Sequence, residues 1–287
     1  MLYDAAIIGT GPAGVSAALN LKIHEKNFIW IGKKDLSDKL SRAERISNYP
    51  GFFDVPGAAL NAAFLGQVRS MGIEITEAMV NSIMPNGDNY ALMAGPDFYE
   101  ARALILTTGV NQGNTLPGEA DYVGRGVSYC ATCDGGLYRG RTIAALCFNP
   151  RFEHEVKFLA SLAGKVHFFP YYKNPGVAGD NVISPAGRPV AVLGDERVTA
   201  LRLNTGEELA VDGVFCLRDS IALNTLLPGL ETTSDGHIKV DRAMATNLPG
   251  VFAAGDCTGR PYQYTKAVGE GNVAAHSAVE YLAEKEK

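Results

Sequence analysis

A glycine loop near the start of the chain constrains the fold more than any other sequence feature. The loop is Gly9-Thr10-Gly11-Pro12-Ala13-Gly14, and it follows the short apolar run Ala5–Ile8. The next segment, Val15–Leu21, is rich in alanine and leucine and has helical propensity. A strand, a Gly-x-Gly-x-x-Gly loop and a helix in this order are the context in which such a loop binds a dinucleotide. The sequence therefore predicts an α/β fold that opens with a dinucleotide-binding unit.

Each residue of the loop has its own expected role. Gly9 permits the tight turn, Gly11 lets the backbone approach a pyrophosphate, and Gly14 allows the helix and strand to pack closely. The N-terminus of the helix that follows offers backbone amides and a positive dipole to phosphate groups.

One part of the dinucleotide fingerprint is missing. The next expected strand is Phe28–Ile31, and the fingerprint places an acid at its end to hold a ribose hydroxyl. Gly32-Lys33-Lys34 stand there instead. We therefore expect the adenosine ribose to be held in a different way or less tightly.

Composition indicates a globular chain of about two domains. The chain has 287 residues, of which 46% are hydrophobic and 20% charged. A net charge of −5 argues against a nucleic-acid-binding protein. The chain has neither a leader pattern nor an apolar run of about 18 residues, so we expect a cytoplasmic protein without a membrane span. Five cysteines, an odd number, suit a reducing compartment.

The segment Cys130-Ala131-Thr132-Cys133-Asp134 carries the clearest chemistry. Two thiols in this spacing can close into a disulfide and reopen, and Cys-x-x-Cys pairs lower thiol pKa values. A zinc site needs a second ligand pair, and the sequence has neither a second Cys-x-x-Cys nor suitably spaced histidines. We therefore favour a redox pair and expect no metal. Asp134 is placed either to move protons during thiol exchange or to cap a helix.

Two further segments resemble parts of nucleotide-binding sheets. Val251–Ala254 reads as a buried strand that ends in Gly255-Asp256, and Leu104–Thr107 is a strand followed by Thr108-Gly109. Carboxylates at the carboxyl ends of such strands lie where doubly wound sheets bind ligands. An alanine-rich helix is expected at residues 273–284, with its start at 269–272.

Taken together, these motifs resemble the low-molecular-weight thioredoxin reductases, which are flavoprotein disulfide reductases with two dinucleotide-binding-like domains. The resemblance covers nearly the whole chain, and the matching segments are residues 9–14, 48–51, 107–109, 124–128, 130–135 and 249–256. It implies an FAD domain made of residues 1–114 and 243–287. A second, Rossmann-type domain carrying the Cys-x-x-Cys pair would be inserted at residues 115–242.

The resemblance also implies roles for individual residues. Cys133 would face the flavin, Cys130 would exchange with thioredoxin, and Asp134 would be the acid/base. Residues expected at FAD are Gly9, Gly11, Pro12, Ala13, Gly14, Lys39, Leu40, Asn48, Thr108, Gly109, Gly255, Asp256, Tyr262, Gln263 and Tyr264. One of the two tyrosines would either stack on the flavin or pack in the core. The family further implies a homodimer.

The inserted domain lacks the features that bind NADPH in that family. A second glycine loop is expected after Thr142–Leu146, but residues 147–153 contain no glycine, and Pro150 removes an amide donor. The arginine pair expected after the next strand is replaced by Val166–Tyr172, which contains no arginine. This pattern resembles the NADPH-independent thioredoxin reductases of clostridial type, whose electron donor is reduced ferredoxin.

Two alternatives stay open at this stage. In the first, NADPH would bind at a rebuilt site; in the second, the chain would be a non-catalytic flavin redox sensor.

The charge distribution bears on a ferredoxin partner. Ferredoxins are acidic and would be attracted by basic groups, and the sequence has one such group at residues 33–45 and another at residues 139–173. Solvated surfaces with scattered lysines explain the same pattern.

Overall fold

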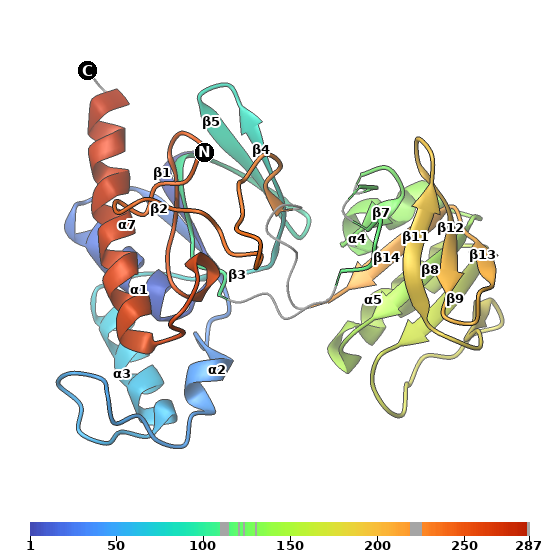
Figure 1. The fold of residues 1–287 in the computed structure, drawn as a ribbon, viewed down its shortest axis with the longest axis horizontal. Helices are drawn as coiled ribbons and strands as arrows, with labels where there is room; N and C mark the ends of the chain where they lie inside the picture. Colours follow the sequence, from blue (N-terminus) through green and yellow to red (C-terminus); the bar gives the residue numbers. More distant parts are fainter. Residues whose placement is uncertain (110–114, 120, 123, 130, 219–225, 286–287) are drawn as a thin grey trace. The chain divides into compact units, whose positions relative to one another are not determined.

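The computed structural model describes the chain except residues 110–114, 120, 123, 130, 219–225 and 286–287, and Cys133 without its side chain. The chain forms two compact units. The first comprises Met1–Asn111 and Leu226–Lys287, and the second comprises Gln112–Thr225. In Figure 1 the first unit combines the blue and red ends of the chain, so both termini contribute to one unit.

The chain returns to the first unit earlier than the expected residue 243. The division falls at Leu226, because backbone pairing ties the following segment to the first unit. Thr232 forms an antiparallel bridge with Ile238, and the Ile238 amide donates to the carbonyl oxygen of Cys257 at 2.8 Å.

A seven-stranded sheet forms the centre of the first unit, in the order β3-β2-β1-β6-β5-β4 with β15 beside β6. The parallel strands are β1 (Leu2–Ile8), β2 (Phe28–Gly32), β3 (Thr76–Glu77), β6 (Asp97–Leu106) and β15 (Val251–Ala253). The antiparallel edge consists of β4 (Val80–Asn86) and β5 (Asn89–Ala94). Because β1 pairs with β2 on one side and with β6 on the other, its carboxyl end is the switch point at which such sheets bind ligands.

Helices from both ends of the chain pack beside each other on this sheet, as Figure 1 shows for α1 (Pro12–Ile23) and α7 (Tyr264–Lys285). The prediction that the last helix starts at residues 269–272 was wrong, because α7 already begins at Tyr264. Gly271 lies inside the helix, where a Cβ atom would be 2.2 Å from the Ala13 carbonyl oxygen. Close helix packing explains this glycine. The remaining helices of the unit are α2 (Asp38–Ser41) and α3 (Gly57–Ser70).

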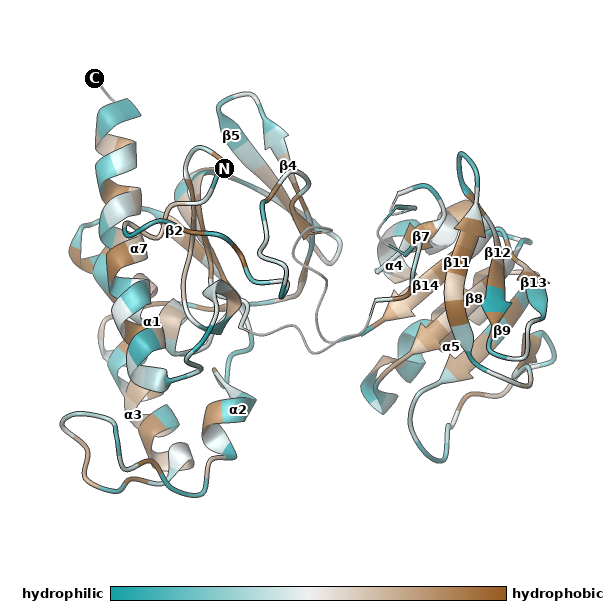
Figure 2. Ribbon diagram, viewed as in Figure 1, coloured by the Kyte–Doolittle hydropathy of each residue, from teal (hydrophilic) through white to brown (hydrophobic). Residues whose placement is uncertain are grey.

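The second unit contains a five-stranded parallel sheet in the order β10-β9-β8-β14-β7. Its strands are β7 (Val127–Ser128), β8 (Thr142–Cys147), β9 (Lys165–Pro170), β10 (Val182–Ile183) and β14 (Gly213–Leu217). Figure 2 shows hydrophobic colouring along β8 and β14, in keeping with strands buried on both faces. Helix α5 (Glu153–Leu162) packs against this sheet through Val156 and Leu159.

Shorter elements complete the second unit. Helix α4 (Ala131–Asp134) is followed directly by a 3₁₀ turn, η1 (Gly135–Tyr138), and another, η2 (Pro150–Phe152), precedes α5. A three-stranded antiparallel sheet comprises β11 (Pro189–Gly194), β12 (Val198–Leu203) and β13 (Glu208–Ala210). Both units are therefore α/β and contain parallel strands in a Rossmann-type order, with an antiparallel edge in the sheet of the first unit. Within the described part of the chain, no helix is both long and apolar enough for a membrane span.

Candidate functional site

The glycine loop of the first unit has the close contacts that its sequence predicts. Gly9 has a φ of +111°, and a Cβ atom there would lie 2.3 Å from the carbonyl oxygen of Thr107. A Cβ atom on Gly14 would lie 2.2 Å from the carbonyl oxygen of Gly9. At Gly11, by contrast, a Cβ atom would meet nothing within 4 Å. Gly9 and Gly14 are thus required by the chain itself, whereas Gly11 borders open space.

Two side chains that pack against the loop donate hydrogen bonds to the carbonyl oxygen of Gly9. The indole nitrogen of Trp30 and the hydroxyl of Thr107 each donate to the Gly9 carbonyl oxygen, both at 2.8 Å. Helix α1 then starts at Pro12 without an acidic residue in its first turn. The first turn therefore adds no negative charge that would oppose pyrophosphate binding at the helix start. Neither Trp30 nor Thr107 was predicted to be part of the site, because the fingerprint does not specify the side chains that support the loop.

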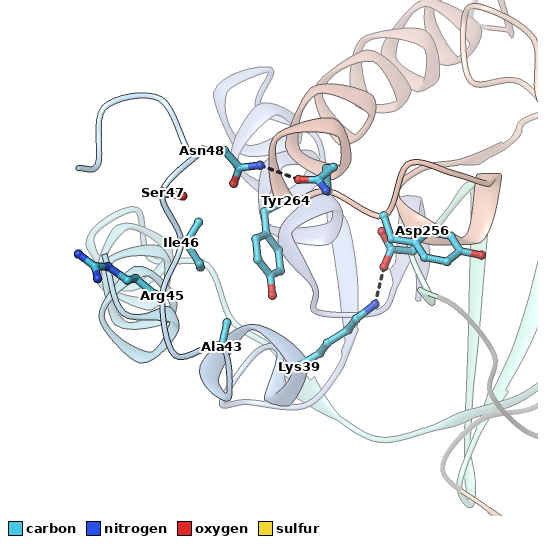
Figure 3. A pocket seen from close by; sticks show the side chains of 10 residues that line it. Lys39, Ala43, Arg45, Ile46, Ser47, Asn48, Asp256 and Tyr264 are labelled. Carbon is cyan, nitrogen blue, oxygen red and sulfur yellow. Dashed lines mark hydrogen bonds and ion pairs between the residues drawn. The ribbon is translucent and has the colours of Figure 1, made fainter. Parts of the chain in front are cut away.

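A cavity of about 350 Å³ lies in the same unit, and six of the fifteen residues expected at FAD line it. Figure 3 shows the side chain of Tyr264 in the middle of this group. The cavity is lined by Lys39, Ala43, Arg45, Ile46, Ser47, Asn48, Asp256, Tyr262, Gln263 and Tyr264. The structure thus brings six of the predicted residues, from segments more than two hundred positions apart, to one cavity.

Polar contacts order the cavity wall. The Lys39 ammonium bonds the Asp256 carboxylate at 2.8 Å, and the Asn48 amide donates to the Gln263 side-chain oxygen at 2.8 Å (Figure 3). Tyr262 holds its hydroxyl 2.7 Å from Nε2 of a histidine, His237. Each contact joins residues distant in sequence, so the wall depends on the folded unit.

Lys266 and Glu270 form a clamp that holds the turn carrying Asp256. The Lys266 ammonium donates to the carbonyl oxygens of Gly255 (2.9 Å) and Gly259 (3.0 Å) and to the Thr258 hydroxyl (3.1 Å). Glu270 pairs with Lys266 at 3.0 Å and accepts from the Gly255 amide at 2.8 Å. The sequence could have indicated this ion pair, because Lys266 and Glu270 are four positions apart at the start of α7.

The turn also joins the cavity to the glycine loop. A Cβ atom on Gly255, whose φ is +90°, would lie 3.0 Å from the Cβ atom of Ala13. Asp256 follows directly and faces the cavity, so the loop and the cavity are adjacent parts of one surface. Predicted residues outside the cavity lining include Leu40, which is fully buried in the core. Thr108 and Gly109 follow β6 at the switch point.

The redox segment lies in the second unit, directly after β7. Cys130 and the side chain of Cys133 lie outside the described residues, whereas Asp134 ends α4. Asp134 occupies the N-cap position of η1 without forming a side-chain capping bond. The next residue, Gly135, packs against α5, where a Cβ atom would lie 3.1 Å from Leu159. The helix-cap interpretation of Asp134 thus has no hydrogen bond to support it.

The switch point of the second sheet carries a stack of aromatic and cationic side chains. Phe148 follows β8, Tyr171 follows β9 and Arg218 follows β14. The two rings are stacked, with centres 4.3 Å apart and planes 16° from parallel. The Arg218 guanidinium lies over Phe148 at 4.4 Å, and Arg188 lies over Tyr171 at 4.8 Å. The carboxyl ends of three adjacent strands are therefore covered by side chains.

A buried ion pair anchors this stack. Arg218 bonds Glu119 at 2.9 Å, and their side chains are 5% and 0% exposed. The Tyr129 hydroxyl donates to the other Glu119 oxygen at 2.8 Å. Burial is the main reason that the pKa of Tyr129 is raised, with the Glu119 charge adding to it. The hydroxyl therefore stays protonated and continues to donate.

The helix that follows β8 is also poorly suited to phosphate. Its first turn contains two carboxylates, Glu153 and Glu155, and the preceding turn η2 is capped by the Asn149 side chain, which accepts from the Arg151 amide at 3.1 Å. Like charge at a helix start opposes phosphate binding.

Four of the five basic side chains at residues 33–45 form ion pairs, including Lys39 and Arg45, which line the cavity. The ion pairs are Lys33–Asp38, Lys34–Glu77, Lys39–Asp256 and Arg45–Asp54. The local charge is therefore closer to neutral than the number of basic residues in the sequence suggests. Charge attraction at this surface is correspondingly weak evidence for an acidic partner.

Comparison with known proteins places the chain among disulfide reductases. Residues 3–142 and 183–271 match the family model described as pyridine nucleotide-disulphide oxidoreductase. A thioredoxin reductase of Listeria innocua is 30% identical over 302 residues, which cover 99% of this chain and 95% of that protein.

Solved structures extend the similarity to the whole chain. A ferredoxin-flavin thioredoxin reductase from Clostridium acetobutylicum has a TM-score of 0.84 and 46% identity, covering 99% of both chains. A thioredoxin reductase from Gloeobacter violaceus has a TM-score of 0.75 and 31% identity, covering 100% of this chain and 96% of its own. The internal segment that the family model leaves unmatched, residues 143–182, contains Phe148, Tyr171 and the two carboxylates of α5.

Proposed function

This chain belongs to the pyridine nucleotide-disulphide oxidoreductase family, and we propose that it reduces thioredoxin with electrons from reduced ferredoxin. It is a flavoprotein of the thioredoxin reductase type with FAD as cofactor. The identity of the electron donor, the roles of the site residues and a cytoplasmic homodimer are parts of the proposal.

The residues of the first unit fit FAD. Gly11 leaves backbone space beside the start of α1, where the pyrophosphate would be held by amides and the helix dipole. Asp256 and Lys39 would hold the polar middle of the cofactor, and Asn48 and Gln263 would lie at the ring. When bound, FAD accepts electrons singly and passes them on in pairs.

The covered switch point of the second sheet is the observation that carries the choice of donor. In doubly wound sheets a dinucleotide binds at this edge, against amides of a glycine-rich turn. Here Phe148, Tyr171 and Arg218 occupy the edge, and Glu153 and Glu155 stand at the helix start. A nicotinamide dinucleotide would have to displace the stack and approach two carboxylates. An electron carrier that docks at the surface would neither displace the stack nor bring phosphate groups near these carboxylates.

The dithiol would pass the electrons to thioredoxin by thiol exchange. A Cys130 thiolate attacks the thioredoxin disulfide, a mixed disulfide forms, and one thioredoxin sulfur leaves as a thiolate. Cys133 then attacks Cys130, the mixed disulfide breaks, and the second thioredoxin sulfur leaves. Two electrons and two protons have moved to thioredoxin, and the enzyme holds a Cys130–Cys133 disulfide. Asp134 would take up and return the protons of these thiols.

Anaerobic stopped-flow spectroscopy of the FAD-loaded protein tests the donor. We expect reduced ferredoxin to bleach the flavin absorbance and to support repeated thioredoxin reduction, whereas micromolar NADPH leaves the flavin oxidised. Rapid bleaching by NADPH would overturn the ferredoxin proposal in favour of a rebuilt nucleotide site. Absence of turnover with either donor would favour a redox sensor.

Single cysteine variants test the dithiol. Cys130→Ser and Cys133→Ser should each abolish thioredoxin reduction, while flavin bleaching by the donor persists. If either variant kept full thioredoxin reduction, the dithiol mechanism would be wrong. Sedimentation of the purified holoprotein measures the expected dimer.

A further inference from the structure

A short hairpin that follows the chain's return to the first unit reaches the wall of the cavity in that unit. The hairpin comprises residues 231–239. The Lys239 amide donates to the carbonyl oxygen of Glu231 at 3.0 Å, and the Thr233 amide donates to that of His237 at 2.7 Å. Because the sequence assigned these residues to the inserted domain, no contact with the cavity of the first unit was predicted for them.

The backbone of this hairpin is bonded to the turn that carries Asp256. The Ile238 amide donates to the carbonyl oxygen of Cys257 at 2.8 Å, and both residues are 1% exposed. Cys257 directly follows Asp256, which lines the cavity. Neighbouring residues of an extended segment point to opposite sides. With Ile238 buried, the side chain of His237 therefore points away from the core.

The imidazole of His237 meets the hydroxyl of Tyr262, which also lines the cavity. Nε2 lies 2.7 Å from the hydroxyl oxygen, and the ring centres are 5.9 Å apart. In one neutral tautomer of histidine the hydroxyl donates to Nε2, and in the other tautomer or in the imidazolium Nε2 donates to the hydroxyl. A hydrogen bond between these two side chains is therefore available in every protonation state of the histidine.

Two cations lie against the ring of the same tyrosine. The Lys39 ammonium is 5.5 Å and the Arg260 guanidinium 5.4 Å from the centre of the Tyr262 ring, both within the range of cation–π attraction. Lys39 also bonds the Asp256 carboxylate at 2.8 Å (Figure 3), so the tyrosine and the carboxylate share one cation. Tyr262 is thus held both at its hydroxyl and at its ring.

We propose that His237 is a positioning residue for FAD, which acts through the Tyr262 hydroxyl to hold this tyrosine in the wall of the cavity. The proposal rests on the FAD site of the proposed function and deepens it. It adds a residue that does not itself line the cavity, and it makes the 231–239 hairpin part of the cofactor site.

A wall residue that is already held in place favours binding. A side chain that loses its freedom only when the ligand binds weakens the affinity by roughly two- to tenfold. The hydrogen bond from His237 removes part of that freedom from Tyr262 in advance. Substitution of His237 should therefore weaken FAD binding by a factor within this range.

The coupling has to act in both directions. If a held Tyr262 favours FAD, bound FAD must favour the arrangement in which the hairpin holds Tyr262. Saturating FAD should therefore slow amide hydrogen exchange of residues 231–239 by the same factor by which His237 strengthens FAD binding. The Ile238 amide reports this most directly, because its hydrogen bond to Cys257 is broken when the hairpin opens.

The test uses FAD alone. Apoprotein of wild type, His237→Leu and Tyr262→Phe is titrated with FAD by fluorescence, and hydrogen exchange of residues 231–239 is measured by mass spectrometry with and without FAD. We expect both variants to bind FAD roughly two- to tenfold more weakly, and FAD to slow exchange of the hairpin in wild type but not in the variants. The double variant H237L/Y262F should bind FAD no more weakly than the single variants, because all three lack the same hydrogen bond.

Matched variants separate positioning from general damage. His237→Gln keeps a side-chain amide that can donate or accept, so its FAD affinity should lie closer to wild type than that of H237L. Lys239→Met changes an exposed ion pair of the same hairpin and should leave FAD affinity unchanged. If positive charge on the histidine were the cause, the deficit of H237L would vanish at about pH 8.5, where an ordinary imidazole is neutral. We expect the deficit to persist there.

Two results would overturn the inference. One is an H237L variant with unchanged FAD affinity and unchanged protection of the hairpin by FAD, and the other is a double variant whose loss equals the product of the two single losses. Asp256→Asn distinguishes these results from a failure of the proposed function. Weaker FAD binding in D256N but not in H237L would retain the cavity as the FAD site and reject only the role of His237. FAD affinity unchanged in every variant would reject the cavity as well.

Discussion

The guanidinium carbon of Arg218 lies 4.4 Å from the centre of the Phe148 ring. These residues follow two adjacent parallel strands, and the Phe148 amide donates to the carbonyl oxygen of Leu217 at 3.0 Å. The contact therefore lies at the switch point of the sheet. Because Arg218 is also paired with Glu119, the aromatic cover over this edge is tied to the buried interior of the second unit.

Breaking the Glu119–Arg218 pair should strongly destabilise the second unit. Glu119→Gln or Arg218→Met leaves an uncompensated buried charge, and we expect a loss of about 3–5 kcal/mol in the free energy of unfolding. Urea denaturation monitored through hydrogen exchange of β14 measures this loss. The double variant E119M/R218M should recover most of it, because well-packed apolar residues can replace a buried pair. Single variants as stable as wild type would show that the pair contributes nothing.

Two glycines of the first loop should respond differently to the same substitution. Gly14→Ala forces a Cβ atom to 2.2 Å from backbone, so we expect loss of folded protein even without FAD. Gly11→Ala meets no chain atom, so the protein should fold but bind FAD roughly tenfold or more weakly, a loss of about 1.4 kcal/mol. Thermal melting and FAD titration distinguish these outcomes.

An exposed helical glycine provides the control for this pair. Gly66 in α3 is exposed and a Cβ atom there would meet nothing within 4 Å, so Gly66→Ala should stabilise the helix by up to about 1 kcal/mol. Equal FAD affinity in the Gly11→Ala variant and wild type would show that the pyrophosphate lies elsewhere.

Removal of the Lys266 clamp should loosen the turn at Asp256. Lys266→Met deletes four hydrogen bonds and leaves Glu270 without its cation, so we expect a loss of about 2–4 kcal/mol. FAD content after gel filtration should fall as well, although Lys266 does not line the cavity. The exposed pair Lys239–Glu231 is the control, and Lys239→Met should cost less than about 1 kcal/mol. Equal losses in the two variants would contradict the clamp.

The buried cysteines should not react with a thiol label in the native protein near neutral pH. Burial raises the pKa of Cys257 to about 11 and also raises that of Cys147. Since only the thiolate reacts, at pH 8 the native reduced protein should label at Cys130 and Cys133 alone. Labelling of Cys257 should increase as the pH rises toward 11, and denaturant should expose all five thiols. Rapid native labelling of Cys257 at pH 8 would contradict its burial.

Local patterns in the sequence were enough to predict much of the fold. The strand before Gly9 and the helix after it are present, although the helix begins at Pro12 rather than Val15. The strand at Val251 is also present. These elements were predictable because apolar runs and glycine spacing act over a few residues. The predicted start of α7 was wrong, because two glycines close together, Gly269 and Gly271, are typical of a helix boundary. Only the packing of Gly271 against Ala13 shows why a glycine lies inside the helix.

The sequence by itself determined that the chain has a dinucleotide loop and a Cys-x-x-Cys pair, and that it lacks a second glycine loop. Whether the backbone of a turn can approach a phosphate depends on the glycines within that turn, so these conclusions need no knowledge of tertiary contacts. Only the tertiary structure decided what replaces the missing loop and which side chain meets Tyr262. Phe148, Tyr171 and Arg218 come from separate strands, and His237 reaches Tyr262 from the segment that returns to the first unit. Such contacts depend on which elements pack together, and that information is spread over the whole chain.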